Sequence, residues 1–350
     1  MSPDAFLKTC PVGCDKSLES TSILLPEGPL LRCVLCGQLI SQCNEEQYLH
    51  SMAEFDTTQG TTPLPESSAR YLERSERLLK KLESMLGRKS QSIKLLDVGC
   101  SSGAFLNIAQ RRGFQAEGLE PAPQAARAAR LKGLTVHAGF LEDMAFPEGS
   151  FDAITIFEVV EHLKDPLLLL KECRRIMRPG GLLVVGTGNT ASWSANFMHS
   201  RWEYFHLDKH GGHVSFFNPL SMSYLAERSG FVVKKMETRS VSFFEKSNCS
   251  FILYRLAKAA GELLNAPSRF LGKGHDMLVF MKGFGQVKNK PLARKSLVAT
   301  QPIKTGELFS ADNITAKRPG AGISPMRWDE VLGQVAQKDY EKDELICAIR

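Results

Sequence analysis

Four of the nine cysteines in this 350-residue chain lie in two close pairs near the N-terminus. Three residues separate Cys10 from Cys14, and two residues separate Cys33 from Cys36. Pairs with this spacing present two thiolates to one tetrahedral ion, and two pairs complete a four-cysteine zinc site. A segment this small buries little apolar surface, so a bound metal would supply folding free energy. The spacing predicts structural Zn²⁺; four incidental cysteines are the alternative.

A second group of residues surrounds a turn that contains Gly99 and Gly103 and follows Asp97. An acid at the end of a strand can meet an amine-bearing ligand. Glu120 lies seventeen residues after Gly103, where a carboxylate can accept both hydroxyls of a ribose. The glycine spacing is shorter than the G-x-G-x-x-G spacing of dinucleotide sites. The pattern predicts a nucleoside-type ligand, with another kind of Rossmann-like nucleotide-binding protein as the alternative.

Histidines occur at two places in the middle of the chain. His162 follows a predicted strand, where its ordinary pKa near 6.5 suits a general base. The second group consists of His206, His210 and His213. These three histidines are candidates for contacting an acceptor, for acting as the base, or for holding a metal ion. The alternative is that both groups orient nearby backbone and have no chemical role.

Aromatic residues precede the second histidine group. Trp202 and Tyr204 lie just before His206, and Phe216 and Phe217 follow the group. Aromatic rings in such a segment can stack on a sugar or another flat ligand, so Trp202 and Tyr204 are candidate substrate-binding residues. Packing inside a lid is the alternative for both.

Alternating strands and helices with short turns must position these residues. The predicted strands are 93–98, 115–119, 134–138, 151–157 and 181–186, and helices are predicted between them. This alternation predicts an α/β fold with a doubly wound, Rossmann-like parallel sheet and helices on both faces. Ligands of such sheets lie beyond the carboxyl ends of the strands, where the glycines fall. Segments 231–238 and 277–282 are expected to form the far edge.

Length and composition divide the chain into parts. At about 150 residues per domain, 350 residues correspond to roughly two to three domains. Polar stretches at 59–65 and 284–293 read as linkers. They predict a zinc-binding segment with its linker over 1–66, a central domain over 67–283, and a small β-rich module over 294–350.

The charge and hydropathy patterns bear on partners and location. Net charge is −6 over residues 1–67 and +9 over 68–284, without a dense basic stripe, so a nucleic-acid partner is not expected. The chain has no apolar run of about 18 residues, which excludes a transmembrane span. Its N-terminus lacks a secretory pattern. We therefore expect a cytoplasmic protein in which the cysteines are not paired as disulfides.

The turn and its surroundings resemble a known family. Residues 95–103 are similar to motif I of class I S-adenosylmethionine-dependent methyltransferases, and 140–152, 157–163 and 178–181 resemble later motifs. The likeness covers about residues 68–283 and is greatest to ubiquinone-biosynthesis O-methyltransferases and sugar methyltransferases. It implies an S-adenosyl-L-methionine site lined by Asp97, Gly99, Cys100, Ser101, Gly103, Glu120, Phe140, Leu141, Glu142 and Phe157.

The C-terminal module carries a second resemblance. Residues 294–325 are similar to the SAF, or antifreeze-like, domain, particularly the one that ends sialic acid synthases. In those synthases an arginine of this domain meets the amino-sugar substrate, and Arg318 occupies the matching position. The barrel and metal site of a synthase are missing. The resemblance implies either recognition of a sugar or a role in homo-oligomer formation.

Together these patterns predict a methyltransferase that acts on a carbohydrate-like small molecule. The acceptor would be a sialic-acid-like sugar, a precursor or a nucleotide sugar in surface-glycan biosynthesis. One alternative is an RNA or protein methyltransferase that uses the zinc segment to recognise its substrate. The other alternative is a non-catalytic scaffold that binds the cofactor or a sugar.

Overall fold

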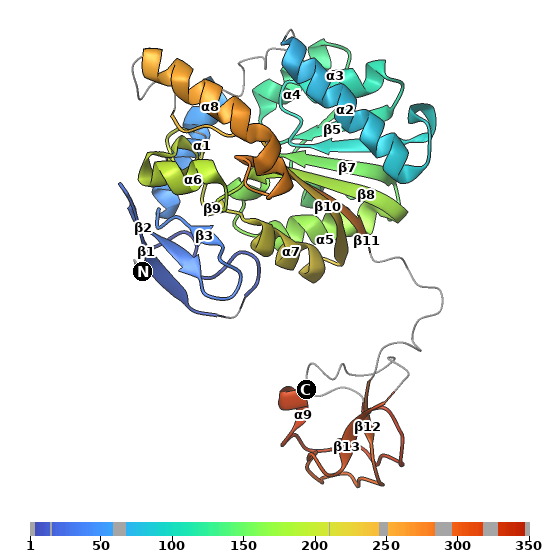
Figure 1. Cartoon of the computed structure of the whole chain (residues 1–350). Coiled ribbons are helices and arrows are strands. Elements are labelled where there is room, and N and C mark those ends of the chain that lie inside the picture. The colour runs from blue at the N-terminus through green and yellow to red at the C-terminus, as the bar shows by residue number, and fades with distance from the viewer. Residues whose placement is uncertain are drawn as a thin grey trace. The chain divides into compact units, whose positions relative to one another are not determined.

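The computed structural model describes residues 4–14, 16–58, 68–209, 211–244, 251–283, 296–317 and 328–346. Among the predicted site residues, His210 and Arg318 lie outside these ranges, as do the two predicted linker stretches. The chain forms two compact units, residues 1–285 and 286–350, each of which is described by itself (Figure 1).

The first unit is built around a seven-stranded sheet in the order β10-β11-β8-β7-β4-β5-β6. The strands are β4 (Lys94–Val98), β5 (Gln115–Glu120), β6 (Val136–Ala138), β7 (Phe151–Phe157), β8 (Met177–Gly188), β10 (Phe231–Arg239) and β11 (Asp276–Gly283). Strands β4 to β8 are parallel, whereas β11 runs antiparallel to both β8 and β10. This topology confirms the doubly wound sheet, with β10 at the predicted edge.

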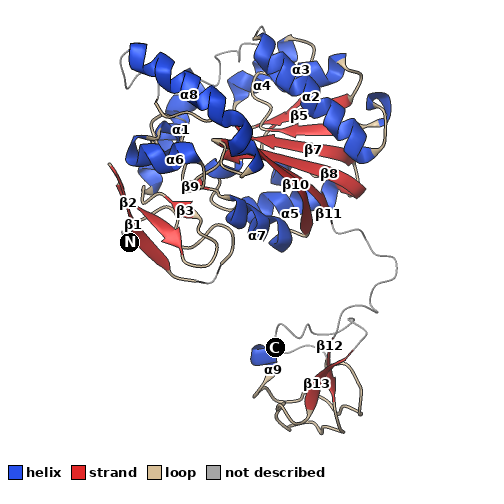
Figure 2. Cartoon of the chain, in the orientation of Figure 1, coloured by secondary structure: helices blue, strands red, loops and turns tan. Residues whose placement is uncertain are grey.

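Helices cover both faces of the sheet (Figure 2). They are α2 (Ala69–Leu86), α3 (Ala104–Arg111), α4 (Pro123–Leu131), α5 (Pro166–Ile176), α7 (Pro219–Arg228) and α8 (Phe251–Phe270). Successive strand residues point to opposite faces. Accordingly Leu95 packs in the core with α2, α3 and α4, and Leu96 in the core with α5 and α7. Apolar side chains from the strands fill both cores. Their packing holds the strand ends in register.

Local sequence signals start two of these helices. Asp165 caps α5 by accepting a hydrogen bond from the Leu168 backbone N–H, and Pro166 occupies the first turn. Asn218 and Ser221 form a reciprocal capping box at the start of α7. The Asp165 cap fixes where the segment after β7 enters α5, and the Asn218 cap fixes where the preceding segment enters α7. Both segments carry candidate site residues.

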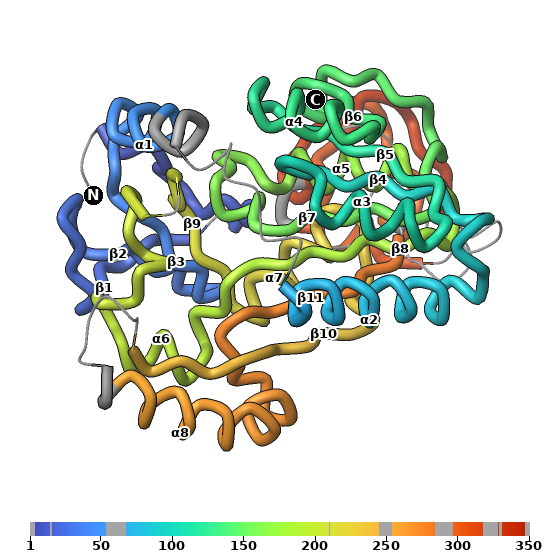
Figure 3. Tube along the Cα trace, turned by 90° about the horizontal axis from the view of Figure 1, so that it is seen from above, coloured from blue at the N-terminus to red at the C-terminus, as the bar shows by residue number. Residues whose placement is uncertain are grey.

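The N-terminal segment belongs to the same compact unit as the central sheet. Its strands β1 (Leu18–Leu25), β2 (Gly28–Cys33) and β3 (Leu39–Ile40) form an antiparallel sheet that is completed by β9 (Ser215–Phe216) (Figures 1 and 3). Helix α1 (Glu45–Thr58) follows β3. Because β9 comes from the connection after β8, this sheet joins the N-terminal segment to the central part of the unit.

The connection between β8 and β9 contains α6 (Trp193–Met198) and single 3₁₀ turns. The second unit contains β12 (Ser296–Ala299), β13 (Ile314–Lys317) and α9 (Trp328–Val331). Leu297, Ile303 and Tyr340 are among the residues of its own small core. None of the helices that the structure describes has the length and apolar character needed to cross a membrane.

Candidate functional site

The glycine turn after β4 requires backbone that other residues rarely adopt. Gly99 and Gly103 have φ angles of 73° and 81°, in the left-handed region. A Cβ on Gly99 would lie 2.4 Å from Cγ2 of Val159, and one on Gly103 would lie 2.3 Å from Cδ1 of Leu134. Both glycines are therefore needed for conformation and for space. The contact with Val159 also shows that this turn lies against the segment that follows β7.

Glu120 ends β5 next to the turn. Its carboxylate accepts hydrogen bonds from the backbone N–H groups of Ser101 at 2.8 Å and of Ala122 at 2.9 Å. The side chain is 7% exposed. Glu120 is thus held rigidly at the carboxyl end of its strand, beside Ser101 of the predicted site.

Asp97 is buried in β4, where Thr155 of the neighbouring strand β7 donates a hydrogen bond to it at 2.7 Å. Burial raises the pKa of Asp97 to about 7, and the charge of Glu120 adds to the rise, whereas the Thr155 hydrogen bond opposes it. A cationic group bound nearby would favour the charged carboxylate. Asp97 is therefore poised to respond to a ligand that carries an ammonium group.

The other predicted cofactor residues surround the same edge. Cys100 is buried against Gly118. A Cβ added to Gly118 would lie 2.5 Å from the sulfur of Cys100. Phe157 packs edge-on against Phe105, with ring centroids 5.2 Å apart. Phe140, after β6, is 58% exposed, and its neighbour Leu141 is buried. An exposed aromatic ring at this position can stack on a flat base.

Glu142 follows Leu141 in a 3₁₀ turn (Leu141–Asp143) and is exposed. It lies one residue beyond the buried anchor Leu141, on the stretch that leaves β6. The structure thus places all ten predicted cofactor residues at or near the carboxyl ends of four adjacent strands, β4 to β7.

A cluster of Glu161, His162 and His213 lies after β7. One ligand-type atom from each residue falls within 4.8 Å of the other two. The imidazole rings of His162 and His213 are 4.6 Å apart, and Nε2 of His213 is 3.9 Å from Oε1 of Glu161. The structure therefore brings together two predicted histidines that lie far apart in the sequence, and adds a buried acid that was not predicted.

Hydrogen bonds fix the buried part of this cluster. Tyr204 donates to Glu161 at 2.6 Å and accepts from the Gly188 backbone N–H at 2.8 Å, and Thr187 also donates to Glu161. Burial, together with the charge of Glu161, raises the pKa of Tyr204. The distance of 2.9 Å between Nδ1 of His213 and the carbonyl oxygen of Tyr204 requires a proton on Nδ1, because a carbonyl oxygen can only accept a hydrogen bond. The network thus fixes the orientation of the His213 ring.

The remaining predicted residues of this segment lie elsewhere. His206 is hydrogen-bonded through Nε2 to the carbonyl of Ser200, and among the described residues it is not grouped with His213 for metal binding. Trp202 is fully buried, stacked on Tyr204 and hydrogen-bonded to His275. Its burial favours the packing role that the sequence left open.

A hollow of about 470 Å³ opens beside this network at the carboxyl ends of β7 and β8. Its lining consists of Glu158, Trp202, Glu203, Tyr204, Ser240, Ser242, His275 and Asp276. Glu158 adopts a positive φ of 52°, an uncommon conformation for a side-chain-bearing residue, and such strain often marks a functional position. Ser240, Ser242, His275 and Asp276 were not predicted from the sequence. Their positions at the facing ends of β10 and β11 were the available signal.

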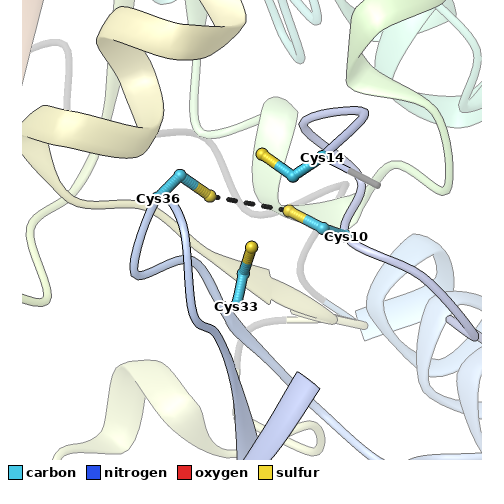
Figure 4. A group of neighbouring side chains, drawn as sticks. All are labelled: Cys10, Cys14, Cys33 and Cys36. Atoms are coloured by element: carbon cyan, nitrogen blue, oxygen red, sulfur yellow. Dashed lines mark hydrogen bonds between the residues drawn. The ribbon is translucent and has the colours of Figure 1, made fainter. Parts of the chain in front are cut away.

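The four cysteines predicted to bind metal converge in the N-terminal segment (Figure 4). All four are buried, their sulfur atoms lie within 4.8 Å of one another, and those of Cys10 and Cys36 are 3.6 Å apart. Tetrahedral zinc with Zn–S bonds of about 2.3 Å requires sulfur separations of about 3.8 Å. The donor set and its spacing therefore fit Zn²⁺. Cys43 is buried but lies outside the group.

Burial, together with the neighbouring Cys36, raises the pKa of Cys14 to about 12. A bound cation reverses this effect, because metal ligation requires thiolates. The cluster also contacts the central domain: Arg228 donates to the carbonyl of Gly13, and Asn218 donates to that of Cys36 at 3.2 Å. A metal here would therefore stabilise the junction between the two parts of the unit.

Two family models match the chain. Residues 69–235 match the model described as "Methyltransferase domain", and residues 294–348 match the SAF domain.

Curated relatives share separate parts with the chain. An N,N'-diacetyllegionaminic acid synthase of Campylobacter jejuni is 58% identical over 59 residues, which are 17% of this chain and 18% of the synthase. A ubiquinone biosynthesis O-methyltransferase of Xanthomonas oryzae pv. oryzae is 38% identical over 103 residues, or 27% of this chain and 43% of that enzyme. The chain thus spans less than half the length of these relatives.

Among solved structures, a SAM-dependent methyltransferase from Archaeoglobus fulgidus has 21% identity and a TM-score of 0.42, over 59% of this chain and 94% of that one. The family matches and the sheet topology agree on the central part of the chain. Residues 69–235 form a domain of the methyltransferase family with the class I fold, and residues 294–348 form a SAF domain.

Proposed function

We propose that this protein transfers the methyl group of S-adenosylmethionine to a carbohydrate-like small molecule. The observation that carries the proposal is the arrangement at one edge of the sheet. There the glycine turn and Glu120 adjoin, through the Gly99–Val159 contact, the segment with Glu158, Glu161 and His162. A site for a nucleoside-bearing donor and a site for a proton acceptor thus lie side by side.

The cofactor supplies an electrophilic methyl group on a sulfonium. In our proposal Glu120 accepts hydrogen bonds from the ribose hydroxyls, Asp97 faces the amino group, and Phe140 and Leu141 flank the adenine. These contacts would orient the donor, and closure of the hollow would exclude water. The methyl carbon bonds to an acceptor oxygen as its bond to sulfur breaks, and the acceptor's proton must leave.

We assign that proton to His162. His162 is partly exposed, whereas His213, whose ring is 4.6 Å from that of His162, is 2% exposed and lies next to the buried Glu161. In this arrangement His213, Glu161 and Tyr204 are positioning residues that hold the ring of His162 and oppose its displacement. A positioned general base contributes about 10² to 10⁴-fold to the rate of such a step.

Two findings support a carbohydrate-like acceptor. The hollow is lined by polar and aromatic side chains, including Glu158, Tyr204 and Ser242, as hydroxyl-rich ligands require. The SAF domain and the 58% identity with a legionaminic acid synthase connect the chain to proteins of sialic-acid-like sugars. We further propose that the SAF domain, with Arg318, contributes to acceptor recognition, and that the four cysteines hold structural Zn²⁺.

The test is a turnover assay on the full chain with S-adenosylmethionine and a panel of sialic-acid-like sugars, their precursors and nucleotide sugars. We expect S-adenosylhomocysteine and an acceptor 14 mass units heavier, as O-methylation requires. Calorimetry with S-adenosylmethionine alone runs in parallel. Absence of both turnover and cofactor binding would overturn the enzymatic proposal, whereas binding without turnover on any acceptor would favour a non-catalytic scaffold.

A further inference from the structure

A second hollow, of about 320 Å³, lies between helices α2 and α8 near the end of β10. Arg70, Glu73, Arg74 and Arg77 line it from one face of α2, at helical spacings of three and four residues. The facing residues of α8 are Lys258, Glu262, Asn265 and Arg269, at the same kind of spacing. Each of the two helices thus directs one row of polar side chains toward the hollow.

The charge of this lining is strongly positive. It contains five Arg and Lys side chains and two Glu side chains, and one of the acids, Glu73, pairs with Arg77 along its own helix. Within the described part of the chain, Arg70, Arg74, Lys258 and Arg269 form no ion pair. Burial lowers the pKa of the nearby Arg239; the charges of Glu237 and Asp276 oppose this fall, and those of Arg74 and Arg269 add to it. Cations are therefore crowded together without enough anions to balance them.

The basic hollow is adjacent to the hollow beside Glu158. Ser240 lines both of them, since it follows β10 directly between the two spaces. The two hollows therefore meet at this residue. The two hollows differ in charge. The hollow beside Glu158 is lined by the acids Glu158, Glu203 and Asp276, whereas the hollow between α2 and α8 is basic.

We infer that the hollow between α2 and α8 binds the phosphate or diphosphate group of the acceptor, while the sugar-like part that receives the methyl group occupies the hollow beside Glu158. Arginine forks match phosphate oxygens in pairs, and a concave basic surface concentrates the field on an anion. This inference rests on the proposed function and narrows its acceptor to a phosphorylated or nucleotide-linked sugar.

Calorimetry of the full chain with inorganic pyrophosphate and with a nucleoside diphosphate tests the anion site without methyl transfer. We expect both probes to bind at low salt and to bind less tightly as salt is added. The double variant Arg74→Gln/Arg269→Gln should weaken nucleoside diphosphate binding at least about tenfold. Its affinity for S-adenosylmethionine should stay within about twofold. Arg111→Gln, at an exposed arginine ending α3, is the matched control.

Lys258→Glu, on the α8 wall, is a second variant, and thermal melting checks that each variant folds. Unchanged nucleoside diphosphate affinity in folded variants, or no binding of either probe to the wild type at low salt, would overturn the inference. So would tighter binding of a 20-nucleotide RNA that depends on the same arginines, which would indicate a nucleic-acid surface. Probe binding by a chain that does not bind S-adenosylmethionine would leave the anion site standing and refute the proposed methyl transfer.

Discussion

The sheet edge has a proposed cofactor half, which holds the predicted S-adenosylmethionine residues, and a proposed acceptor half, which holds the hollow beside Glu158. The two halves are assembled in different ways. Every residue assigned to the cofactor half lies within residues 97–157, on successive strand–turn units. The acceptor half combines the end of β7, the connection from β8 to β9, the facing ends of β10 and β11, and contacts from the N-terminal segment. A site made of local turns depends on its own backbone, whereas a site made of distant segments depends on everything that holds those segments together.

The N-terminal segment shows this dependence most directly. The hydroxyl of Tyr48 donates to the carbonyl of His162 at 3.0 Å, and Ser51 donates to that of Leu207 at 2.5 Å. Strand β3 pairs with β9, where Ser215 follows His213 by two residues. The segment that carries the cysteines therefore supports the backbone on both sides of the histidine pair.

The largest effect is expected from His162→Ala. Loss of the proposed base should lower kcat by about 10² to 10⁴-fold and leave the affinity for S-adenosylmethionine nearly unchanged. Steady-state kinetics and calorimetry measure the two quantities. His50→Ala, at an exposed histidine on α1, is the matched control. A His162→Ala variant with more than a third of wild-type kcat would remove this residue from the chemistry.

Glu120→Ala tests the cofactor half. Removing the two proposed hydrogen bonds from the ribose hydroxyls to this carboxylate should weaken binding of S-adenosylmethionine at least about a hundredfold, because each is worth about 1.5–3 kcal/mol. Glu120→Gln keeps the shape of the side chain and should have a smaller effect. The exposed Glu148→Ala serves as control in the same calorimetric titration. Unaltered affinity in Glu120→Ala would place the cofactor elsewhere.

Cys33→Ser tests whether the two halves depend differently on the N-terminal segment. We expect loss of stoichiometric zinc by metal analysis, a fall in kcat of about tenfold, and a change in cofactor affinity of less than about threefold. Cys43→Ser, outside the cluster, should retain the metal. A full complement of zinc in Cys33→Ser would contradict the four-cysteine site, and equal losses in both halves would contradict the comparison.

A separate prediction, on stability rather than activity, concerns the pH dependence contributed by Asp97. Its pKa is raised from 3.8 to about 7 in the folded protein, so the folded state binds more protons than the unfolded state between those values. The free energy of unfolding should therefore fall as pH rises from about 4 to about 7, by up to about 1.4 kcal/mol per pH unit from this group. Denaturant titrations of wild type and Asp97→Asn should differ in this slope. Parallel pH profiles would show that Asp97 does not titrate in this range.

The sequence by itself determined the sheet and the cofactor half, because both are local. Alternation of apolar residues produces strands with two buried faces, and glycines are required where φ is positive, so residues 95–103 and Glu120 could be recognised from their order alone. The spacing of the cysteines was likewise sufficient to place the two members of each pair on one short turn, and the structure shows that the two pairs meet.

Only the tertiary structure decided which histidine lies beside which acid. His162 and His213 become neighbours because the connection after β8 returns to pair with β3, and Glu161 is brought to Tyr204 by the burial of both. The basic hollow has the same origin. The sequences of α2 and α8 each show a regular row of polar residues, but only the packing of the two helices makes these rows face each other. Contacts between distant segments depend on the summed packing of the core, which no single motif specifies.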